Sequence, residues 1–183
     1  MRKIVIIYIV VLLSCLGLRA QNTADSGQFL DAAREYAEGR YLQAQEKFLV
    51  LLDSAPDDDA VNYYLGLCEL ALGENGRAAE HLTRATQLDS SNAWYLNALA
   101  TLYSNEGDRA SLADVCEKLV KMSPALYNTP NTLTLIADAR FQQKRDSVAL
   151  AYYNQALELD PSYAPAELGK IELLRICDSR AFH

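Results

Sequence analysis

A pattern that recurs four times along the chain constrains its fold more than any other feature of the sequence. The last copy lies in residues 146–161, where apolar side chains recur at the spacing of one helix face and a proline ends the run. Equivalent positions are separated by 34, 34 and then 37 residues, which predicts a fold of repeated helical units. The four series of equivalent positions are Ala44, Ala78, Leu112 and Ala149; Phe48, Leu82, Cys116 and Tyr153; Leu51, Ala85, Leu119 and Ala156; and Pro56, Ser90, Pro124 and Pro161.

Each repeat is expected to hold two helices joined by a tight turn. In the second repeat we expect helices over residues 60–72 and 76–87, with Gly73 ending the first through its tolerance of a left-handed backbone. A lysine replaces glycine in the last of the equivalent turns, which predicts a less regular turn there. The equivalent turn residues are Gly39, Gly107 and Lys144.

Small residues stand where the two helices of each pair are expected to cross, because small side chains let two backbones approach closely. Leu112 replaces alanine in the third pair, so this pair either sits wider or is shifted in register. The small residues at the expected crossings are Ala32, Gly66, Ala100 and Ala137 on first helices and Ala44, Ala78 and Ala149 on second helices.

The charge of the chain bears on its partners. The 183 residues include 17 basic and 24 acidic side chains, which gives a net charge of −7. Nucleic acids and anionic membrane surfaces attract clustered cations, so the acidic balance argues against both as partners. Half of the residues are hydrophobic, which is enough for a sizeable core.

The first twenty residues have the order of a secretory signal peptide. Two basic residues precede an apolar run over residues 4–13, and Ala20 offers a cleavage position. The run is short for a membrane span, which needs about 20 apolar residues. Two alternatives stay open: residues 12–15 resemble a bacterial lipobox that would lipidate Cys15, and an uncleaved leader would act as an anchor.

The repeats resemble those of the tetratricopeptide repeat (TPR) family in their 34-residue unit, the Leu65-Gly66 pair, the small residues at the helix crossing and the terminal proline. The resemblance covers about residues 25–163 and implies an all-α, right-handed superhelix (an α-solenoid) with a concave inner face. The three extra residues are expected in a loop near residues 127–130. The expected organisation is a signal peptide over 1–20, a flexible polar segment over 21–26, four repeats over 25–58, 59–92, 93–126 and 130–163, a capping helix over 164–177 and a tail over 178–183.

The capping helix is expected to cover the apolar face of the last repeat and to present its other side to water. The residues expected to face the repeat are Leu168, Ile171, Leu174 and Arg175, and those expected to face water are Glu167, Lys170 and Glu172.

The sequence contains no pattern of residues typical of a catalytic, cofactor-binding or metal-binding site. Of the two histidines, His81 is expected on the surface of a helix and His183 is the last residue. The acidic run over residues 57–59 lacks the glycine and distal glutamate of a calcium loop and is expected to lie at a helix start. We therefore expect a protein that is not an enzyme and needs no cofactor.

Three cysteines follow Cys15. Cys68 and Cys116 fall on apolar helix faces, and no two of the three are closely spaced in sequence. We expect Cys68, Cys116 and Cys177 to be structural thiols, with one disulfide or a metal site as alternatives.

The family resemblance implies a binding groove lined by first helices. Trp94 could be an aromatic anchor there, or it could pack only against a neighbouring repeat. The first helices carry no lysine, and Arg34 and Arg140 are their only arginines, so we expect no basic clamp for a peptide carboxylate. The candidate groove residues are Tyr63, Trp94, Asn97, Thr101, Asn131, Thr134 and Asp138.

These observations predict an exported TPR scaffold that binds a protein or peptide along its concave face. The leader places it in the periplasm, at the cell envelope or outside the cell. One alternative is a lipid-anchored factor of cell-envelope assembly, and a third hypothesis is an enzyme whose site is not recognised.

Overall fold

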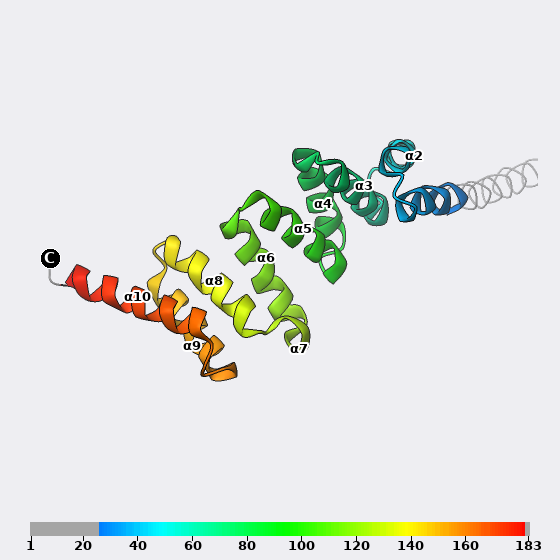
Figure 1. Ribbon diagram of the computed structural model, residues 1–183. Coiled ribbons are helices and arrows are strands. Elements are labelled where there is room, and N and C mark those ends of the chain that lie inside the picture. Colours follow the sequence, from blue (N-terminus) through cyan, green and yellow to red (C-terminus); the bar gives the residue numbers. More distant parts are fainter. Residues whose placement is uncertain (1–25, 182–183) are drawn as a thin grey trace, which may run out of the picture. The chain divides into compact units, whose positions relative to one another are not determined.

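The computed structural model describes residues 26–181, with side chains through residue 179, and the regular structure in this range is entirely helical (Figure 1). The all-α prediction is confirmed, whereas the expected leader and most of segment 21–26 lie outside the described residues. The chain is helical from residue 26 through residue 37. The helices that follow are α2 (Tyr41–Ser54), α3 (Asp59–Leu72), α4 (Asn75–Leu88), α5 (Ala93–Glu106), α6 (Arg109–Met122), α7 (Pro124–Tyr127), α8 (Pro130–Gln142), α9 (Asp146–Leu159) and α10 (Ala164–Ala181).

These helices form two compact units, and each is described by itself. The first unit includes α2, α3 and α4 and ends at Asp89; the second begins at Ser90 and includes α5 through α10. In the first unit α3 packs against α2 and α4. In the second unit α5 packs on α6, α6 on α8, and α9 on both α8 and α10.

The helix starts reproduce the sequence period. The second helices of the repeats begin at Tyr41, Asn75, Arg109 and Asp146, at the same spacing as the series of apolar positions. The contact between α5 and α6 is less extensive than the contacts within the second and fourth pairs, which agrees with the expected wider third pair. Leu112 is half-buried there, whereas the neighbouring Ala113 is fully buried.

The three extra residues form a helical turn rather than a plain loop. Pro124 was expected only to end the third repeat, but it begins the one-turn helix α7. Proline suits this first helical position because its missing N–H would have no partner there. Thr129 then caps α8 by accepting a hydrogen bond from the Thr132 N–H.

The turns within the helix pairs share one backbone conformation. Gly39, Gly73 and Gly107 have φ values of 76°, 78° and 72°, and Lys144 has a φ of 59°. The prediction of a less regular fourth turn is thus wrong in geometry, because Lys144 adopts the left-handed conformation as well. A lysine there costs roughly 1 kcal/mol more than glycine, since its Cβ crowds the following carbonyl.

The acidic run over residues 57–59 lies at the start of α3, as predicted. Asp58 is the N-cap, and its carboxylate accepts a hydrogen bond from the Val61 N–H at 2.9 Å. Asp57 pairs with Arg84 of α4. Asp58 and Asp57 therefore act at the start of α3 as a helix cap and as the partner of an arginine.

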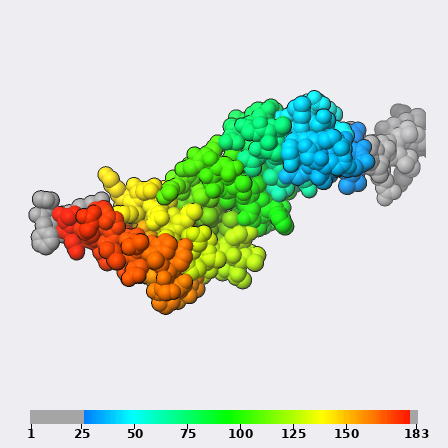
Figure 2. All heavy atoms as spheres, viewed as in Figure 1, coloured from blue at the N-terminus to red at the C-terminus, as the bar shows by residue number. Residues whose placement is uncertain are grey.

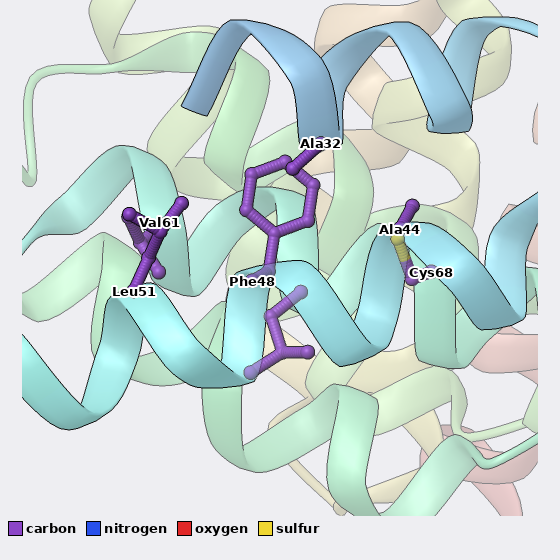
Figure 3. Packing of buried hydrophobic residues seen from close by; sticks show 7 residues of the cluster. Ala32, Ala44, Phe48, Leu51, Val61 and Cys68 are labelled. Atoms are coloured by element: carbon purple, nitrogen blue, oxygen red, sulfur yellow. The ribbon is translucent and has the colours of Figure 1, made fainter. Parts of the chain in front are cut away.

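The core of the first unit is built by the residues that the period singles out. Phe48 extends from α2 toward Ala32 on the first helix, and Cys68 lies near Ala44 (Figure 3). The Phe48 ring stacks on Tyr64 with ring centroids 5.5 Å apart. The residues of this cluster are Ala32, Ala44, Phe48, Leu51, Val61, Leu65 and Cys68.

The crossing of α3 and α4 depends on small residues, as predicted. A Cβ atom on Gly66 would lie 2.6 Å from Leu82 Cγ, so only glycine fits without displacing that side chain. Ala78 is fully buried on the same side of α4. Close approach of the two backbones is therefore built into this helix pair.

Replacing Ala78 by leucine is expected to destabilise the chain by about 1–3 kcal/mol, because the added atoms overpack this crossing. Chemical denaturation followed by circular dichroism would measure the loss. The matched control is Ala71→Leu on exposed α3 surface, which should change stability by less than about 0.5 kcal/mol. Equal stability of the two variants would contradict the close crossing.

The core of the second unit centres on Tyr153. This side chain is almost fully buried, and its hydroxyl donates a hydrogen bond to Asp138 Oδ1 at 2.6 Å. Arg140 is also buried and joins α8 to α6 by ion pairs with Asp114 at 2.6 Å and Glu117 at 2.8 Å. The apolar members of the cluster are Leu133, Ala137, Ala149, Tyr153, Ala156, Ala166 and Leu173.

The capping helix forms, but it packs by a different face from the predicted one. The residues expected to contact the repeat, Leu168, Ile171 and Leu174, are exposed, and Arg175 pairs with Glu172 on the surface. The contact is made instead by Ala166, Leu173 and Gly169, because small residues allow α10 to lie close to Tyr153. The contact of α10 with α9 lies in the orange to red part of the chain in Figure 2. The helix also runs to Ala181, through part of the expected tail.

Candidate functional site

The second unit contains a cavity of about 400 Å³ that collects three of the predicted groove residues. Asn131, Thr134 and Asp138 lie along one face of α8, at the spacing that places side chains on the same side of a helix. The end of α5 and the starts of α6 and α10 complete the lining. The residues involved are Ser104, Gly107, Arg109, Leu112, Asn131, Thr134, Leu135, Asp138, Tyr163 and Pro165.

The polar groups of the lining differ in how far they are already satisfied. Asn131 Oδ1 accepts a long hydrogen bond, 3.3 Å, from the Tyr163 hydroxyl. The Thr134 hydroxyl donates to the Pro130 carbonyl at 2.7 Å and is held by its own helix. Asn131 is exposed, so its amide N–H groups can donate to a ligand.

Asp138 is held in place by a buried residue that does not line the cavity, Tyr153. Its Oδ1 accepts the hydrogen bond from the Tyr153 hydroxyl, which fixes the rotamer of the carboxylate. Burial raises the pKa of the Tyr153 hydroxyl, and the Asp138 carboxylate raises it further, so the tyrosine stays protonated and remains a donor. Leu112 and Leu135 add apolar surface to the same cavity.

The predicted groove residues of α5 do not line this cavity. Trp94 lies in the first turn of α5 and is 73% exposed. Asn97 donates to the Ala93 carbonyl at 2.8 Å and contacts the Tyr127 hydroxyl at 2.6 Å. Its side chain therefore ties α5 to α7, a role that the sequence analysis missed.

Two other predicted residues have local partners. The Thr101 hydroxyl donates to the Asn97 carbonyl at 3.0 Å on its own helix. Tyr63 belongs to the first unit, where its ring lies 5.4 Å from that of Tyr64 and burial raises the pKa of its hydroxyl. The grouping of Tyr63 with the α8 residues stays a prediction.

A larger cavity, about 680 Å³, opens in the first unit between the first helix, α2 and α3. It adjoins Ser26, where the described chain begins. Its lining is apolar apart from Ser26, Ser54 and Asp58, and Asp58 already caps α3. We place the candidate site in the second unit, where several polar side chains converge.

A charged cluster between α3 and α4 was missed by the sequence analysis. Glu69 is fully buried, with His81 Nδ1 at 2.7 Å from Oε2 and Arg77 Nε at 3.3 Å from Oε1. His81 is therefore half-buried and paired, rather than an ordinary surface residue. The sequence does hold a signal for this cluster, because Glu69 stands within the apolar run of α3. A carboxylate buried there needs a charged or hydrogen-bonding partner.

The cysteines lie within the cores or at their margins. Cys68 is fully buried, whereas Cys116 and Cys177 are half-buried. The Cys177 thiol donates a hydrogen bond to Asp146 Oδ2 at 3.6 Å. Burial raises the pKa of Cys68 to about 12, and burial also raises that of Cys116. Neither thiol is therefore a ready nucleophile near neutral pH.

The buried thiol gives a direct test of the first-unit core. With a pKa of about 12, only about one Cys68 side chain in ten thousand ionises at pH 8. A colorimetric thiol reagent should count the same number of thiols in the native wild type and Cys68→Ser. In denaturant the wild type should show one more; a difference already present in the native state would contradict the burial.

Within residues 26–181, no group of three or more histidine, cysteine, aspartate or glutamate side chains is arranged to hold a metal ion. In the same range, none of the helices combines the length and the apolarity needed to cross a membrane.

Comparison with known proteins identifies the repeats. Family models of the tetratricopeptide repeat match residues 30–93 and residues 130–163. No curated protein matches the chain.

Solved structures share the fold at low sequence identity. A MamA structure has a TM-score of 0.63 at 18% identity, over 86% of this chain and 84% of that chain. A tetratricopeptide repeat protein from Parabacteroides merdae has a TM-score of 0.59 at 18% identity, over 85% of this chain and 60% of that chain. The Yersinia enterocolitica type III secretion chaperone SycD, in complex with a peptide of the translocator YopD, has a TM-score of 0.55 at 15% identity, over 64% of this chain and 93% of that chain.

Proposed function

The chain belongs to the tetratricopeptide repeat family, and on that basis we propose that it is a non-catalytic scaffold that binds an extended segment of a partner protein. The observation that carries this proposal is the α8 cavity, where Asn131, Thr134 and Asp138 lie side by side with Leu112 and Leu135. Apolar surface with a few convergent polar groups is the usual character of a ligand site.

The chemistry of the lining suits a peptide backbone. An extended segment presents unpaired N–H and C=O groups, which bind to amide, hydroxyl and carboxylate side chains. Asn131 offers both donors and an acceptor, and Asp138 offers a second oxygen beside the one that Tyr153 occupies. Arg109 supplies the positive charge of the lining.

Rigidity favours binding at this site. Asp138 is held by the buried Tyr153, and α8 is joined to α6 through the buried Arg140. A preformed surface loses little conformational entropy when it binds. One solved relative by fold, SycD, is in complex with a peptide, which supports this mode of recognition for the proposal.

Site-specific photo-crosslinking in intact cells tests the proposal. A photoreactive amino acid at Asn131 should capture a partner protein, because this position opens on the cavity. The control position is Gln155, which is exposed on α9 and does not line the cavity. Capture at Gln155 that equals capture at Asn131, or no capture at either, would contradict the proposal.

We further propose that the scaffold acts outside the cytoplasm, in the periplasm or at the cell envelope. This rests on the leader sequence, which lies outside the described residues. The mass of the mature N-terminus tests it: a chain beginning at Gln21 indicates a cleaved signal peptide, and a lipidated Cys15 indicates a lipid-anchored envelope factor. A chain that keeps Met1 and stays in the cytoplasm would overturn both.

A further inference from the structure

The last helix, α10, exposes an apolar stripe that the described chain leaves uncovered. Leu168, Ile171 and Leu174 recur at three-residue spacing and are 67%, 55% and 42% exposed. The buried side of the same helix carries Ala166 and Leu173, which belong to the core of the second unit. Aliphatic side chains grouped on one exposed face mark a contact surface.

The stripe is not shaped to receive a paired helix of the kind found within the repeats. In α3 and α8 the positions that meet the paired helix carry Gly66 and Ala137, and the Leu82 side chain lies directly against Gly66. The equivalent position of α10 carries Ile171, whose side chain prevents such a close approach. The stripe therefore suits a wider contact in which large side chains interlock.

The charged residues beside the stripe are arranged so that they would attract those of a second, antiparallel copy of α10. Glu167 lies four residues before Ile171 and Arg175 four residues after it; both are exposed and they carry opposite charges. Two antiparallel copies of α10 centred on Ile171 would place Glu167 level with Arg175 of the second copy. A parallel pair would instead place like charges together.

The apolar residues follow the same symmetry. In the antiparallel pair Leu168 lies level with Leu174 of the second copy, and the two Ile171 side chains meet at the centre. Antiparallel packing also brings opposite ends of the two helix dipoles together. Each contact other than the central one between the two Ile171 side chains then occurs twice, as in any interface formed by a two-fold axis.

We propose that α10 is the interface of a symmetric dimer in which two copies of this chain pair their last helices in antiparallel orientation around Ile171. The occupant of the stripe is thus a second copy of the same chain. The proposal does not depend on the α8 cavity. Because the patch is small, the association is weak and depends on protein concentration.

Sedimentation equilibrium of the full chain tests the dimer. The mean mass of the wild type should rise toward twice the monomer mass as the concentration increases to about 500 μM. Ile171→Asp should weaken association by at least about tenfold. The matched control is Leu126→Asp on α7, which is 72% exposed and should associate like the wild type.

Charge reversal tests the orientation. Glu167→Arg and Arg175→Glu should each weaken the dimer, because each places like charges level with one another, and the double variant should restore it. Circular dichroism should show unchanged helix content in all variants, since the altered residues are exposed. A wild type that stays monomeric throughout, association that survives Ile171→Asp, equal loss in Leu126→Asp, or a double variant no tighter than the single ones would each overturn the proposal.

Discussion

Replacing Phe48 by alanine is expected to lower the free energy of unfolding by about 3–5 kcal/mol. The ring is fully buried and packs against the first helix and α3, so its removal leaves a cavity between three helices. It also removes the stacked contact with Tyr64 and the edge contact with Phe29.

Chemical denaturation monitored by circular dichroism would measure this loss. The control is Phe48→Leu, which keeps much of the buried volume and should cost less than about 1.5 kcal/mol. If the free energy of unfolding of Phe48→Ala lies less than about 1 kcal/mol below that of the wild type, Phe48 does not hold these helices together.

Replacing Tyr153 by alanine is the corresponding test in the second unit. The side chain extends from α9 and is almost fully buried against α8 and α10, where its ring occupies the space next to Gly169. We expect a loss of about 3–5 kcal/mol, because the variant loses the ring and leaves a cavity at the base of α10.

The hydroxyl of Tyr153 can be tested separately. Tyr153→Phe keeps the ring and removes only the hydrogen bond to Asp138, so it should cost about 1 kcal/mol. Denaturation curves of Tyr153→Ala and Tyr153→Phe, measured side by side, separate the contribution of the ring from that of the hydrogen bond. A phenylalanine variant as unstable as the alanine variant would place the stabilisation in the hydrogen bond rather than in the ring.

The repeat period predicted most of the fold because it records which side of each helix meets its neighbours. Ala78, Leu82 and Ala85 recur at the period and are all fully buried. The helix bounds followed within a residue for the second repeat, since capping and turn residues mark them locally.

The face by which α10 packs could not be predicted in the same way. Both the stripe through Ile171 and the side through Leu173 have helical spacing, so periodicity alone does not choose between them. The choice depends on Ala166 and Gly169, whose small size lets α10 approach the Tyr153 ring. Which face of α10 packs is therefore decided by the shape of the α9 surface around Tyr153, which the period of α10 does not record.

The candidate site was predicted in part. Asn131, Thr134 and Asp138 share one face of α8, and helical spacing alone is enough to group them. The role of Asn97 depends on Tyr127, which α7 brings within 2.6 Å through a turn that the repeat period does not contain. The buried Glu69 and His81 likewise became a pair only through the packing of α3 on α4.

The most direct measurement of the central claim is the affinity of the chain for the segment captured by crosslinking at Asn131. Isothermal titration should show that Asn131→Ala weakens binding by about tenfold or more, because the variant loses the hydrogen-bonding amide that opens on the α8 cavity. Gln155→Ala on α9 should bind like the wild type. Equal affinity of the wild type and both variants would contradict a binding surface at the α8 cavity.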